Sequence, residues 1–148
     1  MITKKDTIRL CLQGIRGKNW YRSAGDQIEA FADRRGYDKE TVCAILAITS
    51  PRVAVTRNIR IAMKYLAGRD DWNDGVMSTI CRGVAKYEAG EGINGPKTSA
   101  FCDNLMGRMD SICLDSWMAK AFGVDTNKVT QIGVSKPIKG ESATLRIS

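Results

Sequence analysis

The sequence of 148 residues contains no histidine. Histidine is the commonest general base near neutral pH and the commonest metal-binding side chain. Any acid–base or nucleophilic chemistry must therefore use Asp, Glu, Lys, Tyr or Cys side chains.

Cysteine is present but lacks the spacing of a metal site. None of the five cysteines forms a Cys-x-x-Cys pair, and their spacing matches no zinc or iron–sulfur pattern. We therefore expect no metal and no cofactor. An odd number of cysteines without regular spacing is typical of reduced thiols in a cytoplasmic protein.

Long apolar runs are also absent. No stretch approaches the roughly 20 apolar residues that span a bilayer. The first ten residues, MITKKDTIRL, lack the apolar segment of a secretory signal. With a hydrophobic share of 43%, the chain is predicted to be a cytoplasmic protein without a membrane partner. Residues 1–148 suit one domain, which we expect to be monomeric.

Positive charge is in excess. Lysine and arginine number 23 against 16 acidic residues, which gives a net charge of +7. This balance favours a polyanionic partner such as nucleic acid, although many small basic proteins bind none.

The hydrophobic pattern is helical over most of the chain. It predicts helices at residues 6–13, 23–36, 39–49, 54–67, 76–89, 96–107 and 116–122. In the first helix, Ile8, Cys11 and Leu12 share one face. After Gly123 the periodicity weakens, which predicts an irregular tail at 124–148. The expected architecture is therefore all-α.

The stretch GINGPKTSAF, residues 92–101, joins two of these helices. Gly92 and Gly95 frame a turn, and Pro96 suits the first position of a helix. Such a turn exposes backbone amides beside a positive helix end, which together can bind a phosphate. An ordinary corner between two helices explains the glycines equally well.

Lys97 and Asp115 each lie near the start of a predicted helix. Lysine in the first helical turn opposes the helix dipole, so local stability does not explain its presence. It is either a solvated surface residue, a phosphate contact or a nucleophile. Asp115 is explained by helix capping alone, or it is a functional carboxylate facing the same site as Lys97.

Together, GINGPKTSAF and LDSWMAKAFG resemble the signature of the helix–hairpin–helix DNA glycosylases. The resemblance is to the endonuclease III-like branch and to its short virus-encoded members. Gly95-Pro96-Lys97 matches the Gly-x-Lys of the hairpin, and Asp115 follows Lys97 at the family's spacing of 18 positions (115 − 97). The resemblance covers about residues 38–124 and implies a helix–hairpin–helix fold that binds double-stranded DNA.

The resemblance also implies a reaction and its residues. Lys97 would attack the sugar C1′ of an extruded nucleotide, expel a damaged or modified base and form a Schiff base that can nick the strand. Asp115 would stabilise the developing positive charge or deprotonate the lysine. The implied DNA-binding residues are Gly92, Ile93, Asn94, Gly95, Thr98, Ser50, Pro51, Arg52 and Asn58. Trp117 is the candidate for stacking on the extruded base.

Two positions depart from the family pattern. Ile93-Asn94-Gly95 stands where the family usually has Gly-hydrophobic-Gly, and Trp117 stands where it commonly has histidine. Two alternatives therefore accompany the glycosylase hypothesis. One is a helix–hairpin–helix DNA-binding module that has lost catalysis, and the other is a viral enzyme that modifies DNA bases on the same scaffold.

Overall fold

The computed structural model describes residues 3–17, 19–111 and 113. This part of the chain is helical and contains no strand, which confirms the all-α prediction. Its elements are α1 (Lys4–Gly14), η1 (Ile15–Gly17), α2 (Trp20–Arg35), α3 (Lys39–Thr49), α4 (Val55–Leu66), η2 (Asp70–Asn73), α5 (Ser78–Glu88) and α6 (Pro96–Leu105), where η marks a 3₁₀ helix. The helix expected at 116–122 and the tail at 124–148 lie outside the described residues.

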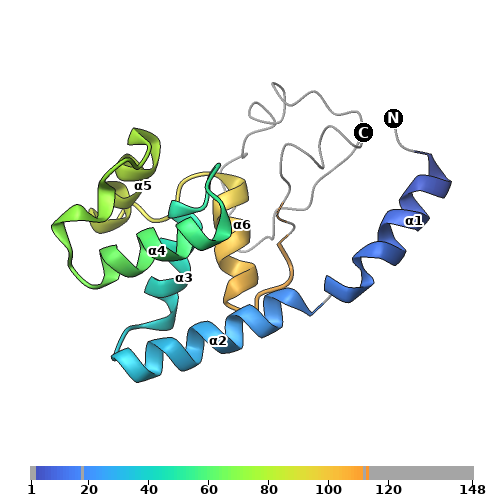
Figure 1. Cartoon of the computed structure of the whole chain (residues 1–148), viewed down its shortest axis with the longest axis horizontal. Helices are drawn as coiled ribbons and strands as arrows, with labels where there is room; N and C mark the ends of the chain where they lie inside the picture. Colours follow the sequence, from blue (N-terminus) through green and yellow to red (C-terminus); the bar gives the residue numbers. More distant parts are fainter. Residues whose placement is uncertain (1–2, 18, 112, 114–148) are drawn as a thin grey trace.

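Helix α3 is the centre of the fold (Figure 1). Every residue from 42 to 49 is buried, and a helix that is apolar on all sides must be enclosed by others. Helices α2, α4, α5 and α6 pack around it. The helix begins at Asp38, whose carboxylate accepts a hydrogen bond from the Thr41 amide at 2.8 Å.

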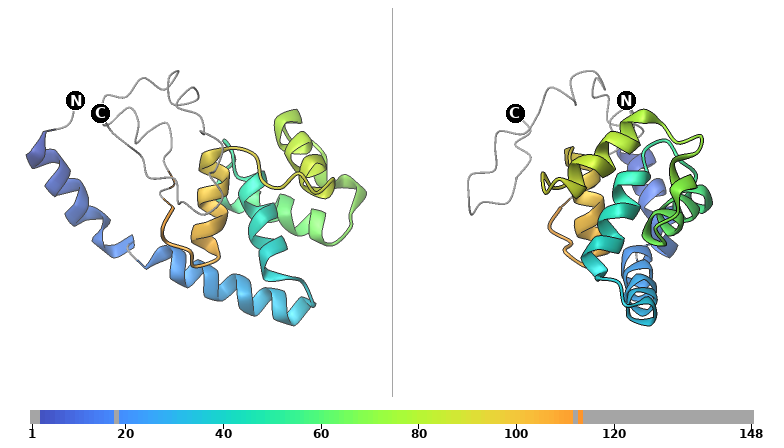
Figure 2. Two further views of the ribbon diagram at one scale, coloured as in Figure 1. Left: turned by 180° about the vertical axis from the view of Figure 1, so that it is seen from behind. Right: turned by 90° about the vertical axis from the view of Figure 1, so that its left-hand side faces the viewer.

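Helix α2 runs along one end of the other helices and packs against both α3 and α6 (Figures 1 and 2). Gly25 permits this contact, because a Cβ atom there would lie 2.8 Å from the Leu105 carbonyl oxygen. At the start of α2, the Tyr21 and Phe101 rings meet edge to face with 6.2 Å between their centroids.

Helix α1 lies apart from this bundle (Figures 1 and 2). The face that carries Ile8, Cys11 and Leu12 is exposed: Ile8 is 52% exposed, Leu12 is 64% exposed and Cys11 is exposed. Thr3 and Asp6 start this helix with a reciprocal capping box. The apolar spacing correctly predicted a helix, but it could not show whether another element covers that face.

Candidate functional site

The connection between α3 and α4 is a tight turn over residues 50–53. The Val53 amide donates to the Ser50 carbonyl at 3.1 Å, with Pro51 and Arg52 at the central positions. Arg52 has a φ of 57°, the only positive φ outside glycine in the part of the chain that the structure describes. Proline followed by a residue with positive φ is typical of a type II turn, in which glycine usually takes the second place. The exposed Arg52 side chain is thus presented by a conformation that costs about 1–3 kcal/mol.

A buried pair of polar residues, Thr49 and Asn58, holds this turn on its interior side. Thr49 is 0% exposed and Asn58 is 7% exposed. The Thr49 hydroxyl lies 2.5 Å from Asn58 Oδ1 and 2.7 Å from the Ile45 carbonyl, and its single hydrogen serves one of them at a time. Asn58 Nδ2 donates to the Leu46 carbonyl at 3.0 Å. This carbonyl belongs to the last turn of α3, where its only contact within the helix is the Thr49 hydroxyl at 3.5 Å, so the pair joins α3 to α4.

Of the residues predicted at the displaced base, only some reach the surface. Arg52 is exposed, Ser50 and Pro51 are half-buried, and Asn58 lies in the interior. Both polar atoms of the Asn58 side chain are used within the protein. Its observed role is to hold the turn, and contact between Asn58 and DNA stays a prediction.

The connection between α5 and α6 is rich in glycine. Gly90, Gly92 and Gly95 have φ values of 78°, 76° and 95°, a region that favours glycine. Between them, the half-buried Ile93 side chain packs against the core, while Asn94 is exposed. Ile93 therefore anchors the connection and leaves its glycine backbone at the surface.

Helix α6 begins without a side-chain cap. Gly95 is its N-cap residue and Pro96 takes the first helical position. The first backbone bond of the helix runs from the Ser99 amide to the Gly95 carbonyl at 3.0 Å. Because proline has no N–H, the amides of Lys97 and the half-buried Thr98 are the first donors of this helix, and amides at such positions have no partner within the helix.

The Lys97 side chain is exposed at this helix start. Among the described residues, no carboxylate lies within ion-pair distance of its amine. The amine thus extends into solvent beside the positive end of the helix dipole.

After α6, the chain returns along the same helix. Asp103 accepts hydrogen bonds from Arg108 at 3.2 Å and from Ser111 at 3.3 Å. Cys113 Sγ then donates to the Lys97 carbonyl at 3.6 Å. Burial raises the pKa of the Tyr21 hydroxyl, and nearby Cys113 raises it further, so the returning segment also lies near the start of α2. Asp115 and Trp117 lie outside the described residues.

The two connections lie at the same end of the bundle. Helix α3 runs toward this end and α6 runs away from it, so the end of α3 and the start of α6 are neighbours along this direction (Figures 1 and 2). The turn that carries Arg52 and the glycine connection before Lys97 therefore flank one end of the molecule.

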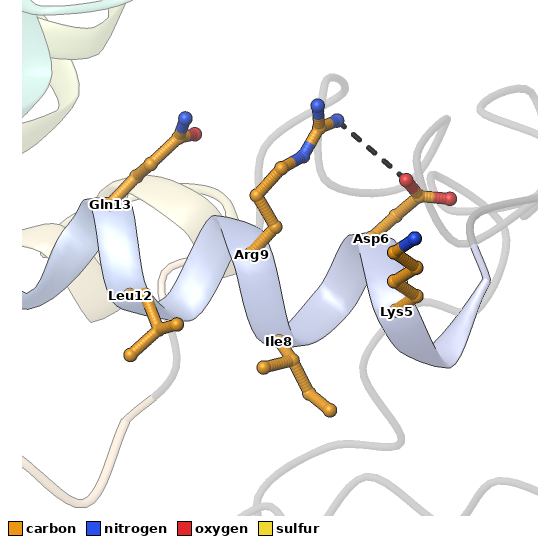
Figure 3. A pocket seen from close by; sticks show the side chains of 6 residues that line it. All are labelled: Lys5, Asp6, Ile8, Arg9, Leu12 and Gln13. Atoms are coloured by element: carbon orange, nitrogen blue, oxygen red, sulfur yellow. Dashed lines mark ion pairs between the residues drawn. The ribbon is translucent and has the colours of Figure 1, made fainter.

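A hollow of about 900 Å³ lies beside α1. Figure 3 shows that all six of its lining residues belong to this one helix, where Arg9 pairs with Asp6 at 3.6 Å. A hollow lined by a single exposed helix encloses nothing and is separate from the end that carries Lys97. Among the described residues, no group of three His, Cys, Asp or Glu side chains is placed to hold a metal ion. None of the described helices has the length and apolar character that crossing a membrane requires.

Sequence reasoning missed Thr49 as a member of the site. A threonine at the end of an apolar helix has no signal of its own, although Thr49 and Asn58 are close enough in sequence to meet across the turn. It also missed the return of Cys113 to α6, because loop paths leave no periodic signal.

A family model described as "Family of unknown function (DUF7178)" matches residues 11–137. No curated protein matches the chain, and no solved structure matches it either.

Proposed function

The chain belongs to the DUF7178 family, and we propose that it is a DNA glycosylase with AP-lyase activity. The observation that carries the proposal is the position of Lys97. Its amine is exposed at the start of α6, which has no side-chain cap and directly follows the glycine connection. In this proposal, α5, residues 89–95 and α6 are the helix–hairpin–helix, and the partner is double-stranded DNA.

The glycine connection supports phosphate binding. The backbone at Gly92 and Gly95 carries no side chain, and α6 directs unpaired amides and its positive dipole end toward the same surface. These are the features with which helix starts bind phosphate groups. A phosphate held there lies near Lys97, which places the sugar of the bound strand close to the amine.

The path of the chain supports Asp115 as the partner of Lys97. Cys113 touches the Lys97 carbonyl, and Asp115 follows it by two residues. Two residues of chain span at most about 7 Å, so Asp115 follows within that distance of Cys113. The resemblance in sequence and the chain path therefore both support the proposal of this pair.

The proposed reaction uses both residues. Asp115 accepts a proton from the ammonium form of Lys97, and the electron pair of the resulting amine then bonds to C1′ of the extruded nucleotide. The glycosidic bond breaks, its electrons leave with the base, and the base takes up a proton. Opening of the sugar ring gives the Schiff base, and β-elimination then breaks the C3′–O bond of the strand. The Arg52 turn would occupy the gap in the duplex.

Borohydride trapping tests the proposal. The protein is incubated with duplex DNA that carries an abasic site, borohydride is added, and covalent adducts are separated by size. Wild type and Lys4→Ala, which changes an exposed lysine on α1, are expected to form the adduct, and Lys97→Ala is expected to lose it. Tight DNA binding with no adduct and no base release on any lesion would exclude the activity.

Asp115→Asn tests the carboxylate separately. Release of free base, measured by mass spectrometry, is expected to fall by at least tenfold because general acid–base and electrostatic groups contribute about 10²–10⁴-fold. Full activity in this variant, with an unchanged melting temperature, would leave Asp115 as a helix cap only.

A second candidate is a DNA-binding module without catalysis. The exposed position of Lys97 beside unpaired helix amides also fits a simple phosphate contact. In that case Lys97→Ala would weaken binding equally for all sequences and lower its salt dependence, and wild type would form no borohydride adduct.

A further inference from the structure

A groove of about 400 Å³ lies between α4 and the segment that contains η2. It is separate from the glycine connection and from Lys97. Its lining residues are Ala54, Thr56, Arg57, Arg60, Ile61, Lys64, Trp72 and Asp74.

The cations of the groove come from one face of α4. Arg57, Arg60 and Lys64 are spaced by three and four residues, which places them on the same side of a helix. Arg57 Nη2 donates to the Gly75 carbonyl at 2.7 Å, and Gly75 has a φ of 66°. The guanidinium of Arg57 is thus held at the rim by a glycine turn, with its remaining N–H groups available.

Acidic groups neutralise only part of this charge. Asp71 pairs with Lys64 at 2.9 Å and with Arg69 at 2.8 Å, and Asp74 is the one acidic residue in the lining. Arg60 forms no ion pair with any described residue, and the bond of Arg57 to a carbonyl leaves its charge unneutralised. The groove therefore presents two guanidinium groups to an anion.

We infer that this groove binds the phosphodiester backbone of the same DNA that meets the Arg52 turn. The inference rests on the proposed function, which supplies the DNA. Ala54 lines the groove and directly follows the turn at residues 50–53, so the groove begins beside the turn. Guanidinium groups match phosphate oxygens in planar, paired hydrogen bonds, and the half-buried Trp72 ring closes one wall.

The salt dependence of DNA binding tests this inference. Affinity for a 20-base-pair duplex of arbitrary sequence is measured from 50 to 200 mM salt for wild type, Arg60→Gln and the Arg57→Gln/Arg60→Gln double variant. Each lost phosphate contact is expected to reduce the slope of log K against log salt by about 1. Arg35→Gln removes an exposed arginine from α2 and is expected to keep the wild-type slope. Arg60→Gln breaks no bond within the described protein, so its folding is not at issue.

The outcomes separate this inference from the proposed function when the borohydride adduct is measured on the same samples. If both groove variants keep the wild-type slope and still form the Lys97 adduct, the inference that the groove binds DNA is overturned and the proposed lyase activity stands. If the groove variants have reduced slopes and wild type forms no adduct, the groove is supported as a DNA-binding surface and the proposed lyase activity is overturned. Binding of a free deoxynucleoside monophosphate that the double variant loses, with an unchanged DNA slope, overturns the inference in favour of a nucleotide site.

Discussion

At the scale of single residues, Arg52 is held in a backbone conformation that asparagine or glycine adopts at lower energy. Neither the Ser50–Val53 hydrogen bond nor the Thr49–Asn58 pair needs an arginine side chain. A binding partner outside the protein that contacts the charge would explain why an arginine stands at this strained position.

Replacing Arg52 by asparagine is therefore expected to separate stability from binding. Arg52→Asn should raise the free energy of unfolding by up to about 1 kcal/mol, because asparagine tolerates this conformation. The same change should weaken binding to an abasic-site duplex. Urea unfolding and a DNA titration measure the two effects, and a variant that is both less stable and equally tight in binding would contradict this role.

Asn58 is expected to matter for stability. Asn58→Ala removes the closer of two donors to the buried Leu46 carbonyl and the partner of the Thr49 hydroxyl, and poorly paired buried polar groups cost about 1–3 kcal/mol. Asn94→Ala, which changes an exposed asparagine in the glycine connection, should leave urea unfolding almost unchanged. Equal midpoints for the two variants would mean that the Thr49–Asn58 pair does not hold the turn.

At the scale of elements, the close contact of α2 with α6 depends on Gly25. Alanine has the higher helix propensity, but a Cβ at this position would meet the Leu105 carbonyl at 2.8 Å. Gly25→Ala is therefore expected to destabilise the protein by about 1–3 kcal/mol. Gly14→Ala is the matched control, since no atom lies within 4 Å of a Cβ there. Thermal unfolding compares them, and a higher melting temperature for Gly25→Ala would contradict the observed packing.

Helices α4 and α5 are joined by a hydrogen bond from the Tyr65 hydroxyl to Glu88 at 2.7 Å. Burial, together with this bond, raises the pKa of Tyr65 to about 12. The stabilisation that protonated Tyr65 gives the folded protein is complete below the ordinary tyrosine pKa of about 10. It is lost as pH rises through the pKa of Tyr65 in the folded protein. The difference in stability between wild type and Tyr65→Phe should therefore shrink between pH 10 and 12. Urea midpoints of both proteins over this range measure this difference, and a constant difference would contradict a stabilising Tyr65–Glu88 hydrogen bond.

At the scale of the whole molecule, the sequence predicted the helical architecture well. Helix α3 has the predicted bounds, and α4 and α5 differ from theirs by one or two residues at each end. Helix α2 begins at Trp20, three residues before the expected start at Ser23, because the chain enters the helix from Asn19. Helical spacing is a local signal, and these elements follow it, although among them only α3 begins with a side-chain cap.

The arrangement of the candidate site was less accessible from sequence. Lys97 could be placed at a helix start from Gly95 and Pro96 alone. The burial of Asn58 could not be predicted, because an asparagine on an amphipathic helix is ordinarily exposed. The positive φ of Arg52 had no signal either, since this turn position usually carries glycine. Both features arise from contacts between α3 and α4, which only the folded chain brings together.

The molecule as a whole carries its proposed DNA contacts on three features: the Arg52 turn, the glycine connection and the groove beside α4. All depend on α3, whose end carries the turn and against which α4 and α6 pack. Lys97 is the proposed covalent centre of this surface, and the other cations have proposed electrostatic roles.

Mapping the site of covalent attachment tests this claim most directly. The adduct between wild-type protein and abasic-site DNA is reduced with borohydride and digested with protease and nuclease, and the modified peptide is identified by mass spectrometry. We predict a single modified amine, at Lys97. Attachment at another lysine, at the N-terminal amine or at several sites in similar amounts would contradict it.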